Sequence, residues 1–106
     1  MWVNIGGAKV DLNGLAEWIE AELGESWPEA TLDDPRGGKD GNYEFRISAD
    51  GELFFLQLGH RVVLDGTNEE VVALLVQRHW IPRLQDEVCL FVAMRKNAPV
   101  LRPCPN

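Results

Sequence analysis

The stretch from Tyr43 to Leu58 constrains the fold of this chain more than any other. Apolar and polar residues alternate from Tyr43 to Ala49, which is the period of a strand with one buried face. The dipeptide Asp50-Gly51 follows and favours a two-residue hairpin turn. Strands paired outward from this turn form an antiparallel hairpin in which apolar residues oppose one another. The expected pairs are Ile47 with Phe54, Phe45 with Leu56 and Tyr43 with Leu58.

The opposite face of this hairpin is only partly polar. It carries Glu44, Arg46 and Gln57, but also Leu53 and Phe55. An apolar strip on an otherwise polar face indicates that another surface covers it. Leu53 and Phe55 are therefore the candidate residues for a dimer contact.

A helix is expected before the hairpin. Asp11 is a suitable N-cap, and Gly24 is expected to end the helix. Ahead of it, "MWVNI" has the character of a short strand, with a turn at Gly6-Gly7. The helix has one apolar stripe at helical spacing, made of Leu12, Leu15, Ala16, Ile19 and Leu23.

After the hairpin, Gly59-His60 is expected to turn the chain into a third strand, "RVVL". Thr67 and Glu70 have the spacing of a capping box, which opens a largely apolar helix. Pro82 is expected to end that helix near Trp80. The continuous apolar run "VCLFVAM" then predicts an interior strand covered on both faces.

These elements predict the α+β class, with a mostly antiparallel sheet of four to five strands and two helices. The expected order is β-α-loop-β-β-β-α-β. The 106 residues suit a single domain, 1–106, in which residues 25–42 form a long loop and residues 97–106 a tail. There is no basic stretch followed by an apolar one at the N-terminus and no apolar run long enough to cross a bilayer, which predicts a cytoplasmic location.

Charge is distributed unevenly along the chain. The net charge is −7, and no Lys or Arg occurs between Val10 and Pro35. After Glu87 the sign reverses, with basic residues and no acid. A negative surface repels phosphate backbones and attracts basic partners, so we expect binding to neither nucleic acid nor membrane. The acids of the first segment are Asp11, Glu17, Glu20, Glu22, Glu25, Glu29, Asp33 and Asp34.

Sequence motifs for catalysis are weak. Gly38-Lys39 resembles the end of a phosphate-binding loop, but Asp40 follows it and a strand, not a helix, comes next. His60 and His79 lack metal-ligand spacing, and His79 is expected in the last turn of a helix. We therefore predict no catalytic residue, no metal and no cofactor.

The two cysteines do not have the spacing of a metal or redox pair. Cys89 lies inside an apolar run, where burial raises the pKa of a thiol, so we expect an inert core side chain there. Cys104 lies in the tail between two prolines. A disulfide between them is left open, and a reducing compartment suits the pair better.

The resulting hypothesis is a small acidic protein that binds and inhibits a partner by occluding its basic surface. Immunity proteins and anti-defence inhibitors share this general build, which is an analogy of type rather than of motif. Trp27 is expected to supply an apolar anchor. The alternative is a homodimeric structural or accessory subunit that associates through the half-apolar sheet face. A small-ligand-binding protein or enzyme is the least favoured reading. The candidate partner-binding residues are Glu17, Trp18, Glu20, Glu25, Trp27, Glu29, Asp33 and Asp34.

Overall fold

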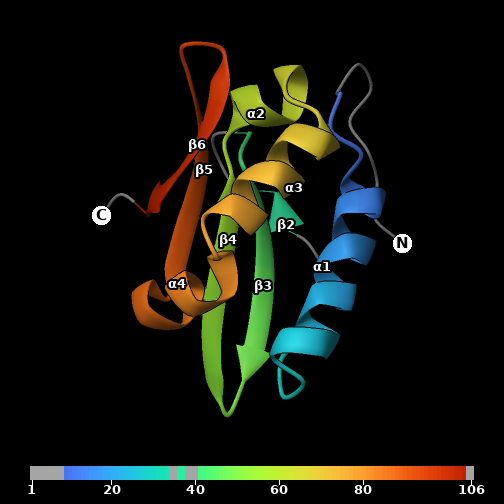
Figure 1. Ribbon diagram of the computed structural model, residues 1–106, viewed down its shortest axis with the longest axis vertical. Helices are drawn as coiled ribbons and strands as arrows, with labels where there is room; N and C mark the ends of the chain where they lie inside the picture. The colour runs from blue at the N-terminus through green and yellow to red at the C-terminus, as the bar shows by residue number, and fades with distance from the viewer. Residues whose placement is uncertain (1–8, 34–35, 38–40, 105–106) are drawn as a thin grey trace.

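The computed structural model describes residues 9–33, 36–37 and 41–104 of the chain. One mixed sheet runs through the molecule, and the helices α1 (Leu12–Ser26), α3 (Asn68–Gln77) and α4 (Trp80–Glu87) cover the same face of it (Figure 1). The strand order is β1 (Thr31–Leu32), β3 (Tyr43–Ala49), β4 (Glu52–Leu58), β5 (Cys89–Arg95) and β6 (Ala98–Pro103), and β2 (Arg36–Gly37) pairs with β3 beside β1. The α+β class and the mostly antiparallel sheet are confirmed. The expected strand in "MWVNI" and the turn after it lie outside the described residues.

The central hairpin has the predicted register. It consists of β3 (Tyr43–Ala49) and β4 (Glu52–Leu58), joined by Asp50 and Gly51. Both turn residues have positive φ, 51° and 80°, which is the conformation of a type I′ turn. Because the turn fixes the register, one apolar set points to the core, and Phe45, Ile47, Phe54, Leu56 and Leu58 are buried.

Helix α1 (Leu12–Ser26) begins as expected. The Asn13 N–H donates to Asp11 Oδ1 at 3.1 Å, and all five residues of the predicted apolar stripe are buried. The helix continues two residues past Gly24, and the N–H of Trp27 donates to the Leu23 carbonyl. Gly24 therefore does not end the helix. The helix ends before Trp27, whose ring is buried in the core.

The prediction of a third strand after the hairpin is wrong. Residues His60–Asp65 form helix α2 instead, although "RVVL" is rich in β-branched residues. Burial of Val62 and Val63 outweighs their weak preference for strand. The side chain of Asn42 supplies the missing cap, because its Oδ1 accepts the backbone N–H of His60 at 2.8 Å.

The second expected helix is two helices. The capping box at Thr67 and Glu70 is confirmed and opens α3 (Asn68–Gln77), whereas Trp80–Glu87 form α4. His79 breaks the helix with φ of 51°, so it is not in the last turn of α3. Pro82 lies in the first turn of α4, where a missing N–H costs nothing, and so does not mark a helix end.

The penultimate strand is less buried than expected. Strand β5 (Cys89–Arg95) runs parallel to β4, and β6 (Ala98–Pro103) pairs with it at the sheet edge. Leu90 and Val92 are buried, but the alternate residues of β5 are only partly buried. The prediction of a strand covered on both faces is therefore wrong.

Two further expectations are corrected at the edges of the sheet. The segment 25–42 is not one long loop, because it contains β1 (Thr31–Leu32) and β2 (Arg36–Gly37). Cys89 is not a free core thiol, since it forms a disulfide with Cys104. The bridge ties the end of β6 to the start of β5, so residues 98–103 of the expected tail are part of the sheet.

Candidate functional site

The first candidate site is an acidic surface on and after α1. Glu17, Glu20 and Glu25 are exposed on the helix outside its buried stripe, and Glu22 is half-buried. Glu29 is exposed in the connection that follows. Among the described residues, the ion pairs are Arg46 with Glu44 and Arg61 with Asp65, and neither involves this surface. No described basic residue therefore forms an ion pair with a glutamate of the acidic surface. We use the name for these five glutamates.

Asp33 does not belong to this surface. It follows β1 at the sheet edge, where its N–H donates to the Arg46 carbonyl. The hydroxyl of Ser48 donates to its carboxylate at 2.6 Å, so the side chain is engaged within the protein. Asp34 lies outside the described residues. Of the eight predicted partner-binding residues, the four acids Glu17, Glu20, Glu25 and Glu29 are exposed on α1 and the connection that follows it.

Of the two tryptophans predicted to bind a partner, Trp27 lies in the core and Trp18 lies at the edge of the core. Trp27 is 7% exposed and packs edge-on against Phe54, with ring centroids 4.9 Å apart. Its expected role as an apolar anchor for a partner is therefore wrong, because the ring is a core side chain. Trp18 is half-buried beside the acidic surface, and its ring lies 6.0 Å from that of Trp80.

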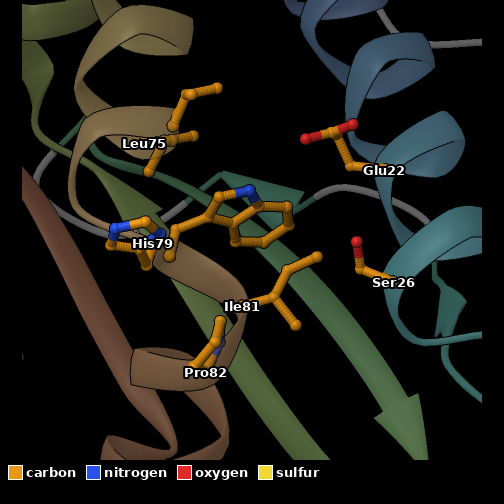
Figure 2. Close-up of a pocket in the computed structure, with 8 residues that line it drawn as sticks. Glu22, Ser26, Leu75, His79, Ile81 and Pro82 are labelled. Carbon is orange, nitrogen blue, oxygen red and sulfur yellow. The ribbon is translucent and has the colours of Figure 1, made fainter.

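A cleft opens between the C-terminal half of α1 and the α3–α4 junction, and its volume is about 330 Å³. Figure 2 shows Glu22 and Ser26 of α1 facing residues of α3 and α4 across it. One wall is polar and the other is mostly apolar. We call this the helix cleft, and its lining residues are Glu22, Ser26, Leu75, Val76, His79, Trp80, Ile81 and Pro82.

The helix cleft holds two unusual groups. Trp80 is 2% exposed, and its indole Nε1 is buried without a hydrogen-bond partner. Val76 is 53% exposed, the most exposed of the large apolar side chains in the described residues. A buried donor without an acceptor costs about 1–3 kcal/mol, so it is uncommon unless it serves a purpose.

A pair of hydrogen bonds, which we call the clamp, joins α1 to α3 at the ends of these helices that are remote from the helix cleft. The Asp11 N–H donates to Asn68 Oδ1 at 2.7 Å, and Asn68 Nδ2 donates to the Asp11 carbonyl at 2.9 Å. These bonds join the N-terminus of α1 to that of α3, and the two helices diverge from there (Figure 1). The sequence carried no signal for this cleft, because one wall comes from α1 and the other from α3, α4 and the turn between them, which only tertiary contacts bring close to α1.

The second candidate surface is the sheet face turned away from the helices. Leu53 is 47% exposed there, and Phe55 and Phe91 are half-buried. The guanidinium carbons of Arg46 and Arg102 lie 5.7 Å from the ring centroids of Phe55 and Phe91, respectively, within the range of a cation–π contact. We call Leu53, Phe55 and Phe91 the open sheet face. Phe91 was missed because its strand was expected to be buried on both sides.

The described residues show no group of three or more His, Cys, Asp and Glu side chains that could hold a metal ion. The ring Nδ1 of His60 lies 3.3 Å from the Gly41 carbonyl, and the backbone N–H of His60 is bound to Asn42. His60 therefore joins α2 to the loop before β3. Within the same ranges, no helix has the length and apolar character needed to span a membrane.

Comparison with known proteins finds no match: no family model, curated protein or solved structure is significantly similar to this chain. Function is therefore inferred from the acidic surface, the open sheet face and the helix cleft.

Proposed function

We propose that this protein binds a partner protein and inhibits it by occluding a basic surface, with α1 as the contact. The observation that carries the proposal is the acidic surface, in which five glutamates follow one another on one helix and its connection. None of them is paired with a described basic residue. Such a field steers basic partners and raises the association rate, and it opposes binding to nucleic acid or anionic membranes.

Two glutamates of the acidic surface lower the stability of the free protein. Glu22 and Glu25 lie near the C-terminus of α1, whose last turn contains no basic residue. Negative charge there opposes the helix dipole at a cost of about 0.3–1 kcal/mol for each residue. Asp86 and Glu87 at the end of α4 have the same disadvantage, so it is the length of the acidic run that distinguishes α1. A basic partner would relieve this repulsion on binding.

The test is charge reversal with a matched control. Glu17→Lys/Glu20→Lys is expected to weaken capture of the partner by about tenfold or more at low salt, because it replaces attraction by repulsion. Asp86→Lys/Glu87→Lys makes the same change in net charge on exposed residues of α4 and should leave capture nearly unchanged. Capture from lysate at low and high salt, followed by binding kinetics on the isolated partner, measures both. Equal loss in the two variants would show that net charge matters and α1 does not.

We propose that the protein is a binder and not an enzyme. What supports this is the use of His60 in a local structural contact and the exposed position of His79 at a helix break. A general base is oriented by a hydrogen bond from its ring, and the described hydrogen bond of a histidine ring is that of His60 Nδ1 with the Gly41 carbonyl.

The second candidate function is a homodimeric or accessory subunit. The open sheet face favours it, because Leu53, Phe55 and Phe91 bring exposed or half-buried apolar area to one surface. In this reading the glutamates of α1 keep the assembly in solution.

The cytoplasm remains our proposed location, with one observation against it. Disulfides persist mainly in oxidising compartments, and Cys89 is bonded to Cys104. Thiol labelling of the protein in freshly lysed cells separates the two cases. A reduced pair supports the cytoplasm, whereas a fully oxidised pair indicates an exported protein.

A further inference from the structure

We propose that the helix cleft receives one lysine or arginine side chain of the partner together with the peptide carbonyl of the same residue. The inference rests on the proposed function and specifies where a basic partner is anchored. Trp27 cannot serve as the anchor because it is buried, so the cleft beside the acidic surface takes its place.

Charge decides what enters the helix cleft. Glu22 and His79 are its titratable lining residues, and Glu22 has no ion pair with a described residue. An anion would be repelled by this carboxylate and by the neighbouring glutamates of α1. A neutral apolar group would remove water from Glu22 without replacing its hydrogen bonds, which is unfavourable. A cation next to Glu22 avoids both costs.

The apolar wall suits the stem of a basic side chain. Leu75, Val76, Ile81 and Pro82 line the cleft opposite Glu22. Lysine and arginine bury their methylene groups against such surfaces while the charged end reaches a polar group. The volume of about 330 Å³ lies at the lower end of the range of ~300–1,000 Å³ for ligand pockets, which fits one side chain with its peptide group.

The indole Nε1 of Trp80 is the reason for including a peptide carbonyl in the proposed ligand. Its Nε1 is a donor only, and it has no acceptor in the free protein. A peptide carbonyl supplies that acceptor, which neither the cation nor its stem can do. Because the nitrogen is closed to solvent, binding requires a small opening between α1 and the α3–α4 junction.

The experiment uses two small probes and the indole N–H signals of the ¹⁵N-labelled protein. Nα-acetyl-lysine methylamide carries the cation, stem and carbonyl, whereas Nα-acetyl-norleucine methylamide keeps the stem and carbonyl without the charge. We expect the lysine probe to shift the Trp80 indole signal downfield and to bind about fivefold more tightly than the norleucine probe. No shift of that signal with either probe overturns the inference.

Matched variants assign the preference to one residue. Glu22→Gln is expected to abolish the fivefold preference for the lysine probe, because it removes the charge while keeping the shape. Glu25→Gln changes an exposed glutamate of the same helix outside the cleft lining and should retain the preference. A preference that survives Glu22→Gln contradicts the assignment.

The failure of this inference is distinguishable from failure of the proposed function. If the lysine probe does not bind but Glu17→Lys/Glu20→Lys loses the partner, the acidic surface acts without the helix cleft. If the probe binds but charge reversal leaves the partner bound, the cleft is a side-chain site and the proposed function is wrong.

Discussion

Val88 ends α4 with φ of 69°, a backbone conformation that a β-branched residue rarely adopts. Its N–H donates to the Leu84 carbonyl at 2.7 Å, and its carbonyl accepts the N–H of Phe55 in the middle of β4. These two bonds hold the residue where the chain passes from helix to strand. The position favours glycine, which has no Cβ to strain.

We therefore expect Val88→Gly to raise the free energy of unfolding by about 1 kcal/mol, the strain released at a positive φ. Ala73→Gly is the control, since it places glycine at an exposed position inside α3 and should lower the free energy of unfolding by a similar amount. Urea unfolding measures both. If both variants are destabilised, the backbone at Val88 is not strained.

At the scale of elements, the clamp between α1 and α3 predicts opposite effects for two glycines of one helix. A Cβ on Gly14 would lie 2.9 Å from Asp11 Oδ2 and 3.2 Å from Asn68 Nδ2, whereas a Cβ on Gly24 would meet nothing within 4 Å. Gly24→Ala should stabilise the protein by about 0.5–1 kcal/mol through helix propensity. Gly14→Ala should lose that gain or destabilise the protein, because the Asp11 carboxylate must leave its capping position. Thermal unfolding measures the stability of both variants. Equal stabilisation by the two substitutions would contradict the close contact at the clamp.

The disulfide makes a prediction for β5 and β6. Cys89 and Cys104 are 15 residues apart, and closing a loop of that length restricts the unfolded chain. Replacing both residues with alanine should lower the free energy of unfolding by about 3 kcal/mol. Denaturant unfolding of the oxidised protein and the double variant measures the difference. A change below about 0.5 kcal/mol would mean that strand pairing alone constrains the hairpin.

At the scale of the whole molecule, two surfaces of opposite character lie on different sides. The glutamates of α1 belong to the helical layer, and the arginines paired with Phe55 and Phe91 belong to the open sheet face. The radius of gyration, 12.7 Å, is close to the ~13 Å of a single domain of this length. The two candidate functions therefore depend on separate surfaces and can be tested separately.

Sedimentation velocity tests the open sheet face. If the protein is a dimer through this face, Leu53→Asp should convert it to a monomer, because a carboxylate would be buried without a partner. Val76→Asp places the same charge at a similarly exposed apolar position on α3 and should leave the dimer intact. A wild-type monomer at all concentrations, or dissociation by both variants, counts against the homodimer.

The elements that could be predicted from sequence are those whose evidence lies within a few neighbouring residues. The β3–β4 register follows from alternation on both sides of Asp50-Gly51, and the starts of α1 and α3 follow from Asp11 and the Thr67–Glu70 capping box. Each depends on local backbone hydrogen bonds and a period visible in the chain. The concentration of glutamates on α1 was predictable for the same reason, because neighbours on one helix remain neighbours in space.

Long-range contacts decided the remaining features. Helix α2 replaces a strand because a parallel connection from β4 to β5 has to cross the sheet, and burial of Val62 with a cap from Asn42 outweighs local preference. The disulfide and the helix cleft join residues far apart in the chain, and no local pattern encodes such distances. Side-chain periodicity thus reveals which face of an element is apolar, whereas only the packed structure shows what, if anything, covers it.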